Sequence, residues 1–421
     1  MNKRRIVDWM QNLALIAMTI SAIFLLTRFP MIEGVFGVPM QVFWSASETA
    51  GALQGDLSSA ISPVHFVVTN DREYGRFAAV NTLTSDVDFQ KVFPLFRQAI
   101  GSAGEWKQVP NRLFRKALGQ PGIYLDLTVP LPLSVAAAWL GENMDSNQSV
   151  RALALVAENE TTKLFFYHTD GTILCCNSAL SSSAVREVTS GFAPNGGRFA
   201  FESDYTTLFP YMIMEQEMAE IVDLYSSLPD GYSSYNLLTA LDFNAHTYAR
   251  YVESSGVEVV IQSPRTLRIG ADGTVRYRAD GDVESDLYRI ASVDDIPTAA
   301  EVLRGVNRIA QALSSGTNAS ALGVSAMENL GNGWEVCFQY YVNGVKVRLP
   351  GDRTALRVVV RGNSVSEFEF YCRSYEPLEQ GGVLLPLSIA TSIAALYDGK
   401  ELILSYVDQG GETLNASWFA E

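Results

Sequence analysis

The stretch WEVCFQYYVNGVKVRLPGDRTALRVVVRGNSVSEFEFYCR, residues 334–373, decides the fold class of this 421-residue chain. Apolar and polar side chains alternate along it with the two-residue period of strands that have one buried face. Asn343-Gly344 and Gly362-Asn363 interrupt the pattern, and such pairs are typical of tight turns because glycine adopts positive φ without steric cost. The stretch therefore predicts an antiparallel meander of four strands, over residues 334–342, 345–349, 355–361 and 365–373.

A long amphipathic helix is predicted just upstream of the meander, over residues 297–313. Asp294 or Asp295 is placed to cap it, and Pro297 suits its first turn. A further helix over 387–397 and strands over 401–407 and 414–419 are predicted downstream. This order of elements indicates an α+β fold in which helices pack on antiparallel sheets. The apolar stripe of the long helix consists of Ala300, Leu303, Val306, Ile309, Ala310 and Leu313.

The N-terminus carries an apolar run of the length that crosses a bilayer. Residues 9–27 contain no charged side chain, and a hydrocarbon core of about 30 Å requires about 20 helical residues. Lys3, Arg4 and Arg5 precede the run and only Arg28 follows it closely, so the positive-inside bias places the N-terminus in the cytoplasm. The alternative is a cleaved signal peptide. Its apolar region would be shorter, and residues 29–32 offer no small-residue cleavage site.

The residues between this run and the second half of the chain predict a domain of their own. Strands are expected over 153–157, 162–168 and 172–176, and a helix over 212–228. We therefore expect four parts: a cytoplasmic tip with a transmembrane helix (1–28), a juxtamembrane stalk (29–60), an N-terminal α+β extracytoplasmic domain (61–230), and a C-terminal α+β region (231–421).

The charge of the chain argues against nucleic-acid binding. The net charge is −15, and because residues 1–28 carry +3, the remainder carries −18. An acidic body repels phosphate backbones. The charge keeps an exposed domain soluble, and this is the interpretation we favour.

Residues with catalytic or metal-binding chemistry are sparse. His65, His168 and His246 are far apart in the sequence and belong to no zinc-binding helix pattern, so we expect no metal site and no cofactor. Hydrolase-elbow and phosphate-loop motifs are absent. Asp86 and Asp88 could be paired acids, although the N-terminus of a helix is their more ordinary place. The pattern favours a protein that is not an enzyme.

Two groups of residues are candidate contact sites. Tyr340, Tyr341, Tyr371 and Tyr375 lie on neighbouring predicted strands, where they either form a binding surface or pack the sheet. Cys337 and Cys372 lie on the same strands and could form a disulfide across them, whereas the vicinal Cys175 and Cys176 could not easily bridge each other. In the predicted span, a face of small residues would allow close helix approach, or it could simply fill the membrane. That face consists of Ala14, Ala17 and Ser21.

Several segments, in their order, resemble a known family. They are MNKRRIVDWMQNLALIAMTISAIFLL (1–26), TLRIGADGTVRY (266–277), FQYYVNGVKVRL (338–349), LRVVVRGNSVSEFEFYCRSYEPL (356–378) and the closing ASWFAE (416–421). This arrangement resembles the YycH/YycI family of membrane-anchored accessory regulators of an essential sensor histidine kinase in Gram-positive bacteria. The length favours a YycH-like member. The resemblance is clearest from residue 266 to the end.

The resemblance implies a non-enzymatic regulator in the cell membrane whose extracytoplasmic domain pairs with a sister YycI-like protein. The pair would contact the sensor histidine kinase of a two-component system for cell-wall homeostasis and tune its activity, partly through transmembrane helices. The resemblance carries no catalytic residues over to this chain. A membrane-tethered cell-wall enzyme, or a binding protein resembling a protease inhibitor, is the alternative.

Reporter fusions test the predicted topology. A reporter that is active only outside the cytoplasm, fused after Glu421, should be active because the basic cluster before residue 9 is retained inside. Reporter activity in intact cells measures this, with a cytoplasm-specific reporter fused at the same position as the control. Activity of the cytoplasmic reporter alone would reverse the assigned orientation.

Overall fold

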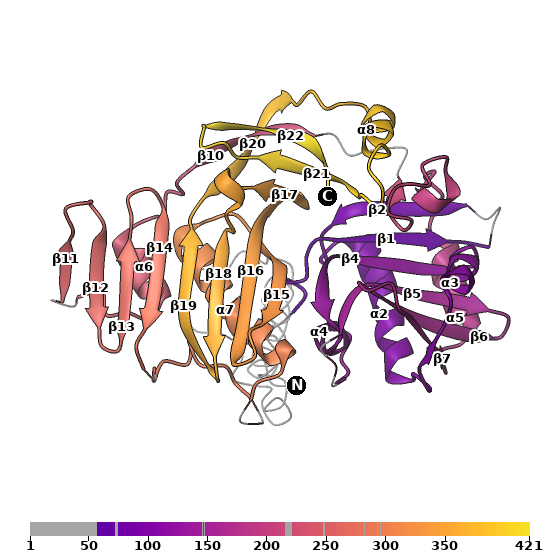
Figure 1. The fold of residues 1–421 in the computed structure, drawn as a ribbon, viewed down its shortest axis with the longest axis horizontal. Coiled ribbons are helices and arrows are strands. Elements are labelled where there is room, and N and C mark those ends of the chain that lie inside the picture. The colour runs from indigo at the N-terminus through magenta and orange to yellow at the C-terminus, as the bar shows by residue number, and fades with distance from the viewer. Residues whose placement is uncertain are drawn as a thin grey trace, which may run out of the picture. The chain divides into compact units, whose positions relative to one another are not determined.

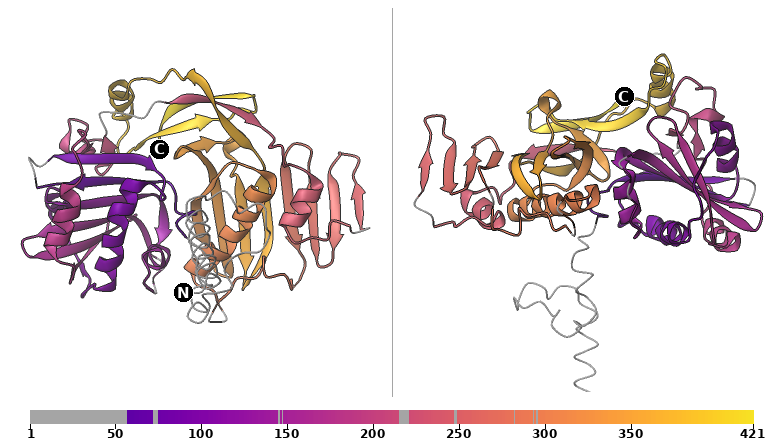
Figure 2. Two further views of the ribbon diagram at one scale, coloured as in Figure 1. Left: turned by 180° about the vertical axis from the view of Figure 1, so that it is seen from behind. Right: turned by 60° about the horizontal axis from the view of Figure 1, so that its bottom comes forward.

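The computed structural model describes residues 57–71, 75–144, 146, 148–214, 221–246, 249–281, 283–292, 294 and 296–421. Within these residues the fold is α+β with mostly antiparallel sheets, as the sequence predicts, and Figures 1 and 2 show its arrangement. The predicted transmembrane segment and its candidate contact face, Ala14, Ala17 and Ser21, lie outside the described residues.

The first sheet has seven strands in the order β2-β1-β4-β5-β6-β7-β3, and every neighbouring pair is antiparallel. Both faces of the sheet are buried, and consecutive residues of a strand point to opposite faces. Each strand therefore contributes side chains to two separate core clusters. The strands are β1 (Val64–Thr69), β2 (Arg76–Thr82), β3 (Lys107–Gln108), β4 (Gly122–Pro132), β5 (Ser149–Glu158), β6 (Thr161–His168) and β7 (Ile173–Ser178).

Helices cover both faces of this sheet. Helices α2 (Val87–Gly101), α4 (Leu133–Trp139) and α5 (Ser182–Ser190) contribute to the core on one face. Helix α3 (Asn111–Leu118) covers the other, with a segment that contains the 3-10 turn Ala200–Glu202 and the short strands β8 (Arg198–Phe199) and β9 (Ile213–Met214). Asp86 caps α2 and accepts a hydrogen bond from the Asp88 amide (2.8 Å), which is the helix-terminal role expected from the sequence.

The second sheet has thirteen strands in the order β11-β12-β13-β14-β19-β18-β16-β17-β21-β22-β10-β20, and β15 pairs with β16. Only β17 and β21 pair in parallel. The strands are β10 (Val222–Ser227), β11 (Arg250–Val252), β12 (Glu258–Gln262), β13 (Arg265–Ile269), β14 (Thr274–Ala279), β15 (Leu322–Asn329), β16 (Gly333–Val342), β17 (Val345–Arg348), β18 (Leu356–Arg361), β19 (Ser364–Tyr371), β20 (Ser374–Gly381), β21 (Leu402–Val407) and β22 (Thr413–Ala420).

Helices α6 (Ser234–Ala240) and α7 (Ala299–Thr317) pack on the second sheet, and α8 (Leu387–Ala394) follows β20. The predicted meander is present as β16 to β19, with the 3-10 turn Pro350–Asp352 before β18. The predicted long helix is α7, but its N-cap is Thr298, not an aspartate. Thr298 and Glu301 form a capping box, in which each side chain accepts from the other residue's amide.

The predicted helix over residues 212–228 is wrong for its described part. Residues 222–227 form β10, which pairs with β20 and β22. Backbone partners from the C-terminal end of the chain are available only in the folded protein, and they override the local apolar spacing.

The two sheets meet at points where backbones approach closely. The Val324 amide of β15 donates to the Ala60 carbonyl (2.8 Å), just before β1. In the turn between β16 and β17, Gly344 has φ +78°, and a methyl group there would overlap the carbonyl oxygen of Asn81 in β2. Glycine at position 344 therefore serves both the turn and the contact between the sheets.

A matched pair of glycines tests this contact. Gly344→Ala should destabilise the protein by about 3 kcal/mol, because left-handed strain adds to a steric overlap with backbone. Gly362→Ala, in the next hairpin turn with φ +56° and open space around it, should cost only about 1 kcal/mol. Urea unfolding of the full-length chain measures both, and equal losses would contradict a close approach at Gly344.

Candidate functional site

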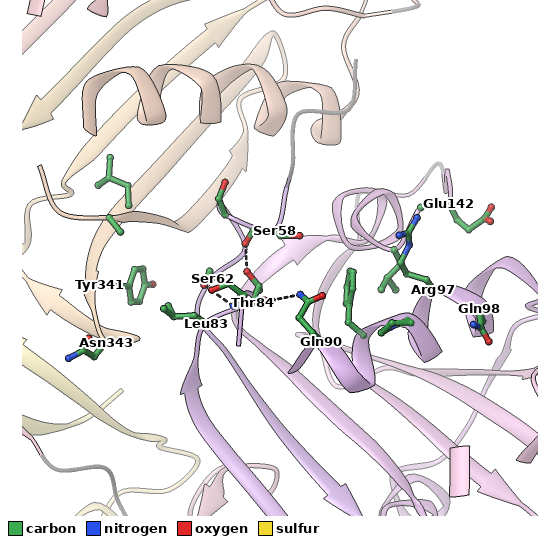
Figure 3. A pocket seen from close by; sticks show the side chains of 18 residues that line it. Ser58, Ser62, Leu83, Thr84, Gln90, Arg97, Gln98, Glu142, Tyr341 and Asn343 are labelled. Carbon is green, nitrogen blue, oxygen red and sulfur yellow. Dashed lines mark hydrogen bonds between the residues drawn. The ribbon is translucent and has the colours of Figure 1, made fainter. Parts of the chain in front are cut away.

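A large cleft lies where the two sheets meet and has a volume of about 1190 Å³ (Figure 3). One wall is a face of α2 that contains Gln90, Phe93 and Arg97. The opposite wall includes Tyr341, at the end of β16, and Asn343, in the turn after it. A ligand in this cleft would therefore contact both sheets at once.

The floor of the cleft is a fixed hydrogen-bonded layer. The Thr84 hydroxyl donates to the Ser58 carbonyl (2.8 Å), and its amide donates to the Ser62 hydroxyl (3.3 Å). The Gln90 side-chain amide donates to the Thr84 carbonyl (2.6 Å). Because the floor satisfies its own polar groups, it is preformed and needs no ligand to order it.

Arg97 is the positively charged residue of the cleft lining. It is exposed on α2 and forms no ion pair within the described residues, while Glu142 is the acidic residue of the lining. Burial raises the pKa of Tyr341 far above its usual value, so this phenol stays protonated even in alkaline solution. The lining thus combines hydroxyl and amide groups with two aromatic rings, one guanidinium and the Glu142 carboxylate. This chemistry suits an extended ligand of little net charge, such as a peptide segment.

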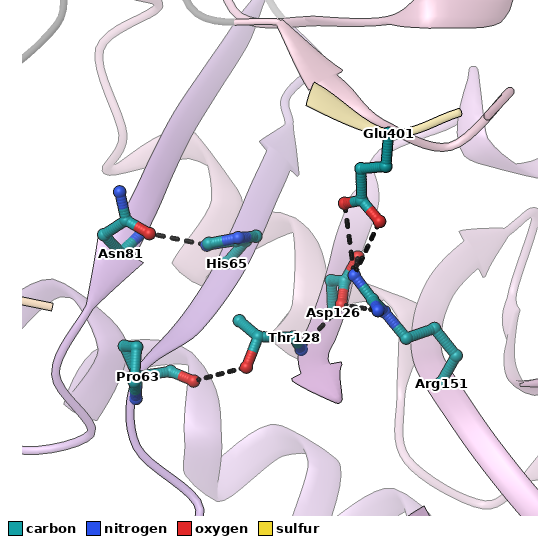
Figure 4. Close-up of polar contacts among 7 residues, drawn as sticks. All are labelled: Pro63, His65, Asn81, Asp126, Thr128, Arg151 and Glu401. Carbon is teal, nitrogen blue, oxygen red and sulfur yellow. Dashed lines mark hydrogen bonds and ion pairs between the residues drawn. The ribbon is translucent and has the colours of Figure 1, made fainter. Parts of the chain in front are cut away.

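A buried ionic cluster lies at the same join (Figure 4). Arg151 of β5 contacts Asp126 of β4 through Nε (2.7 Å to Oδ1) and Glu401, just before β21, through Nη2 (3.0 Å to Oε2). Asp126 is buried and also accepts the Thr128 amide (2.7 Å). One guanidinium thus joins carboxylates from two sheets.

His65 lies near this cluster. Its Nδ1 accepts a hydrogen bond from the backbone amide of Asn81 (2.8 Å), and burial lowers the pKa of His65, which keeps the imidazole neutral.

With both carboxylates ionised, the cluster of Arg151, Asp126 and Glu401 has a net charge of −1. Arg151 can neutralise one carboxylate, and burial together with the nearby Asp126 charge raises the pKa of Glu401 to about 7, although Arg151 opposes the shift. The ionisation state of this join therefore changes near neutral pH.

The four tyrosines do not form one surface. Tyr340 and Tyr375 are buried and meet edge to face with ring centroids 5.4 Å apart. The Tyr340 hydroxyl donates to the Tyr371 carbonyl (2.9 Å), and the Tyr375 hydroxyl donates to Asp408 (2.9 Å). Strand alternation sends neighbouring side chains to opposite faces, so only Tyr341 reaches the cleft.

The remaining sequence candidates are separate. His65 lies on β1, His168 on β6 and His246 in an exposed loop. The described residues contain no group of three or more His, Cys, Asp or Glu side chains that could hold a metal ion. Cys337 and Cys372 are free, so the disulfide considered from the sequence does not form. Instead, the Cys372 thiol lies 3.4 Å from the Thr317 hydroxyl.

Three residues of the site, Arg97, Arg151 and Glu401, were not predicted from the sequence. Arg151 and Glu401 are 250 residues apart, so no local pattern could pair them. The one available signal was Asp126 within the apolar strand IYLDLTV (123–129), since a carboxylate there requires a buried partner.

Comparison with family models, with characterised proteins and with solved structures finds no match for this chain. A search of the described helices finds none that is long and apolar enough to cross a membrane, and the predicted span at residues 9–27 lies outside that search.

The cluster predicts a pH dependence of stability. A carboxyl whose folded pKa is raised binds its proton more tightly in the folded state, so its contribution is present at low pH and is lost as pH rises toward 7. Between about pH 5 and 7, stability should fall by at most about 1.4 kcal/mol per pH unit. Glu401→Gln should flatten this slope, as urea unfolding across pH 5–8 would measure.

The control for this experiment is Glu412→Gln, which changes an exposed glutamate on the strand-connecting loop before β22. This variant should retain the wild-type slope. An unchanged slope in Glu401→Gln would mean that Glu401 does not titrate in this range.

Proposed function

We propose that this protein is a non-enzymatic, membrane-anchored accessory regulator that binds and modulates the sensor histidine kinase of a two-component system. The observation that carries the proposal is the cleft at the join of the two sheets, whose lining suits a peptide segment. The segments at 1–26 and 266–421 that resemble the YycH/YycI family support the same role.

Ligand contact with both walls is the physical basis of regulation. A partner changes the behaviour of a protein only if it binds two arrangements unequally. A segment held between Arg97 on α2 and Tyr341 at the end of β16 would depend on the spacing of the two sheets. The ion pairs of Arg151 at the same join contribute to the free energy that holds the two sheets at this spacing. Binding and the state of the join are then linked.

The partners follow from this role. A segment of the kinase outside the cytoplasm, or of a sister YycI-like protein, is the proposed occupant of the cleft. The predicted span over residues 9–27 would hold both proteins in one membrane and raise their effective concentration, to about millimolar for short linkers. It would also place Ala14, Ala17 and Ser21 where partner helices pass.

Charge reversal in the cleft tests the proposal. Arg97→Glu should weaken co-purification with the kinase from native membranes at least tenfold, about 1.4 kcal/mol, and should alter kinase-dependent reporter output. The side chain is exposed, so folding should be unaffected. Arg112→Glu is the matched control, because Arg112 is also an exposed helical arginine on the first sheet's side but lies outside the cleft.

Equal co-purification of the two variants would remove the cleft from the mechanism. Kinase output that does not respond to deletion of the whole protein would remove the regulatory role itself.

A further inference from the structure

Helix α8 and its flanking residues carry a concentrated group of exposed large apolar side chains. Val383 is 97% exposed and Leu396 is 78% exposed. Residues 382–397 contain sixteen consecutive positions without Asp, Glu, Lys, Arg or His, in a chain whose net charge is −15. We call this surface the α8 apolar face, and it consists of Val383, Leu385, Ile389, Ile393, Leu396 and Tyr397.

The α8 apolar face is held firmly from behind. Ala390, Thr391 and Ala394 form the opposite, buried side of the helix, and Ala394 packs in a core cluster with Met212 and Met214. Hydrogen bonds fasten both ends of the segment. The Trp418 indole donates to the Leu385 carbonyl (2.9 Å), and the Thr207 hydroxyl donates to the Ala395 carbonyl (2.7 Å). The apolar side chains are therefore presented to solvent by a fixed support.

The chemistry of this face fits hydrocarbon better than protein. Ile389, Ile393 and Leu396 follow the helical i, i+4, i+7 spacing, which aligns them along two turns. Binding hot spots between proteins are enriched in Trp, Tyr and Arg, with Leu and Val under-represented. This face is aliphatic, with one tyrosine at its C-terminal edge, where aromatic residues of membrane interfaces belong. Large apolar patches without charge mark a buried contact.

We infer that the α8 apolar face inserts into the interface of a lipid bilayer, the same membrane to which the predicted N-terminal span would fasten the chain. Amphipathic helices that lie in a membrane interface bury their apolar face about 5–10 Å into the boundary between headgroups and acyl chains. The 28 residues from 29 to 56 can extend to at most about 95 Å, which limits how far the described domain can lie from the predicted span. The second contact would fix the orientation of the domain on the membrane.

The test uses the full-length chain in phosphatidylcholine nanodiscs with an environment-sensitive fluorophore on a cysteine introduced at position 393 (Ile393→Cys). The four native thiols are buried, and burial raises their pKa to about 11 or 12, so the label goes to the new thiol. Gln409→Cys, in an exposed loop, is the matched control. A third label, from Leu15→Cys, reports on the predicted span.

The label at 393 should be several-fold brighter than the label at 409 and should be quenched by lipids brominated on their acyl chains. Quenching at 15 without quenching at 393 would overturn the inference while leaving the proposed anchor intact. Quenching at 393 without quenching at 15 would support the inference and contradict the anchor. Disulfide cross-linking between two copies of the unlabelled Ile393→Cys variant, or protection of position 393 only when the kinase is added, would assign the face to protein and overturn the inference.

Discussion

The guanidinium of Arg151 is the contact on which the join of the two sheets depends. It is shared between Asp126, in the sheet to which Arg151 itself belongs, and Glu401, just before β21 of the other sheet. Removing Arg151 should be costly, about 3–5 kcal/mol, because the two buried carboxylates would lose their compensating charge. Asp126 also shapes its own strand: it accepts the amide of Thr128, whose φ is +63°, and the pairing of β4 with β5 shifts register just after it. The carboxylate thus sets a local bend and a long-range contact together.

Backbone contacts complete the join and give the cleft its form. A side chain at Gly323 of β15 would overlap the carbonyl of Ser62, and one at Gly344 would overlap the carbonyl of Asn81. Glycine is therefore required at both positions, because the backbones of the two sheets are in contact there. These two contacts fix the distance between the sheets. The floor of the cleft is the chain segment that contains Ser58 and Ser62, so the same residues make the join and the ligand-facing surface. Any change in the join is consequently a change in the cleft.

Local features of the fold were predictable from the sequence, whereas contacts across long separations were not. The meander from β16 to β19 follows from alternation and from the Asn343-Gly344 and Gly362-Asn363 turns, all of which act over a few residues. The long helix over 297–313 is also a local prediction, but α7 continues to Thr317 and stops at Asn318, which takes a left-handed conformation. The local pattern predicts a helix where β10 forms, because the partners of this strand, β20 and β22, come from the last 50 residues of the chain.

The candidate site was harder to predict for the same reason. Tyr340 and Tyr375 were visible as a cluster, but the acceptors that draw their hydroxyls inward, Asp408 and the Tyr371 carbonyl, become neighbours only through tertiary pairing. Arg97 is one exposed helical arginine among several, and nothing in its sequence neighbourhood marks it. It becomes distinctive only because the second sheet places Tyr341 across the cleft. A site between two sheets is a property of their arrangement, and neither sequence segment contains it.

The positions of the proposed contacts along the chain suggest how they would act on one another. Ala394, the last residue of α8, precedes Glu401 by seven residues, and Gly399 and Phe209 carry backbone hydrogen bonds that pin this short connection. The α8 apolar face therefore lies close along the chain to a carboxylate that Arg151 only partly compensates. In the cleft, Tyr341 lies within the electrostatic influence of Arg151, whose charge opposes the rise in the pKa of this phenol. Because coupling between two binding sites is reciprocal, a membrane contact that favours one state of the join would favour the ligand that prefers that state, by the same free energy. A fully compensated ion pair would not titrate in this range, whereas the surplus carboxylate makes the charge of the join change near neutral pH.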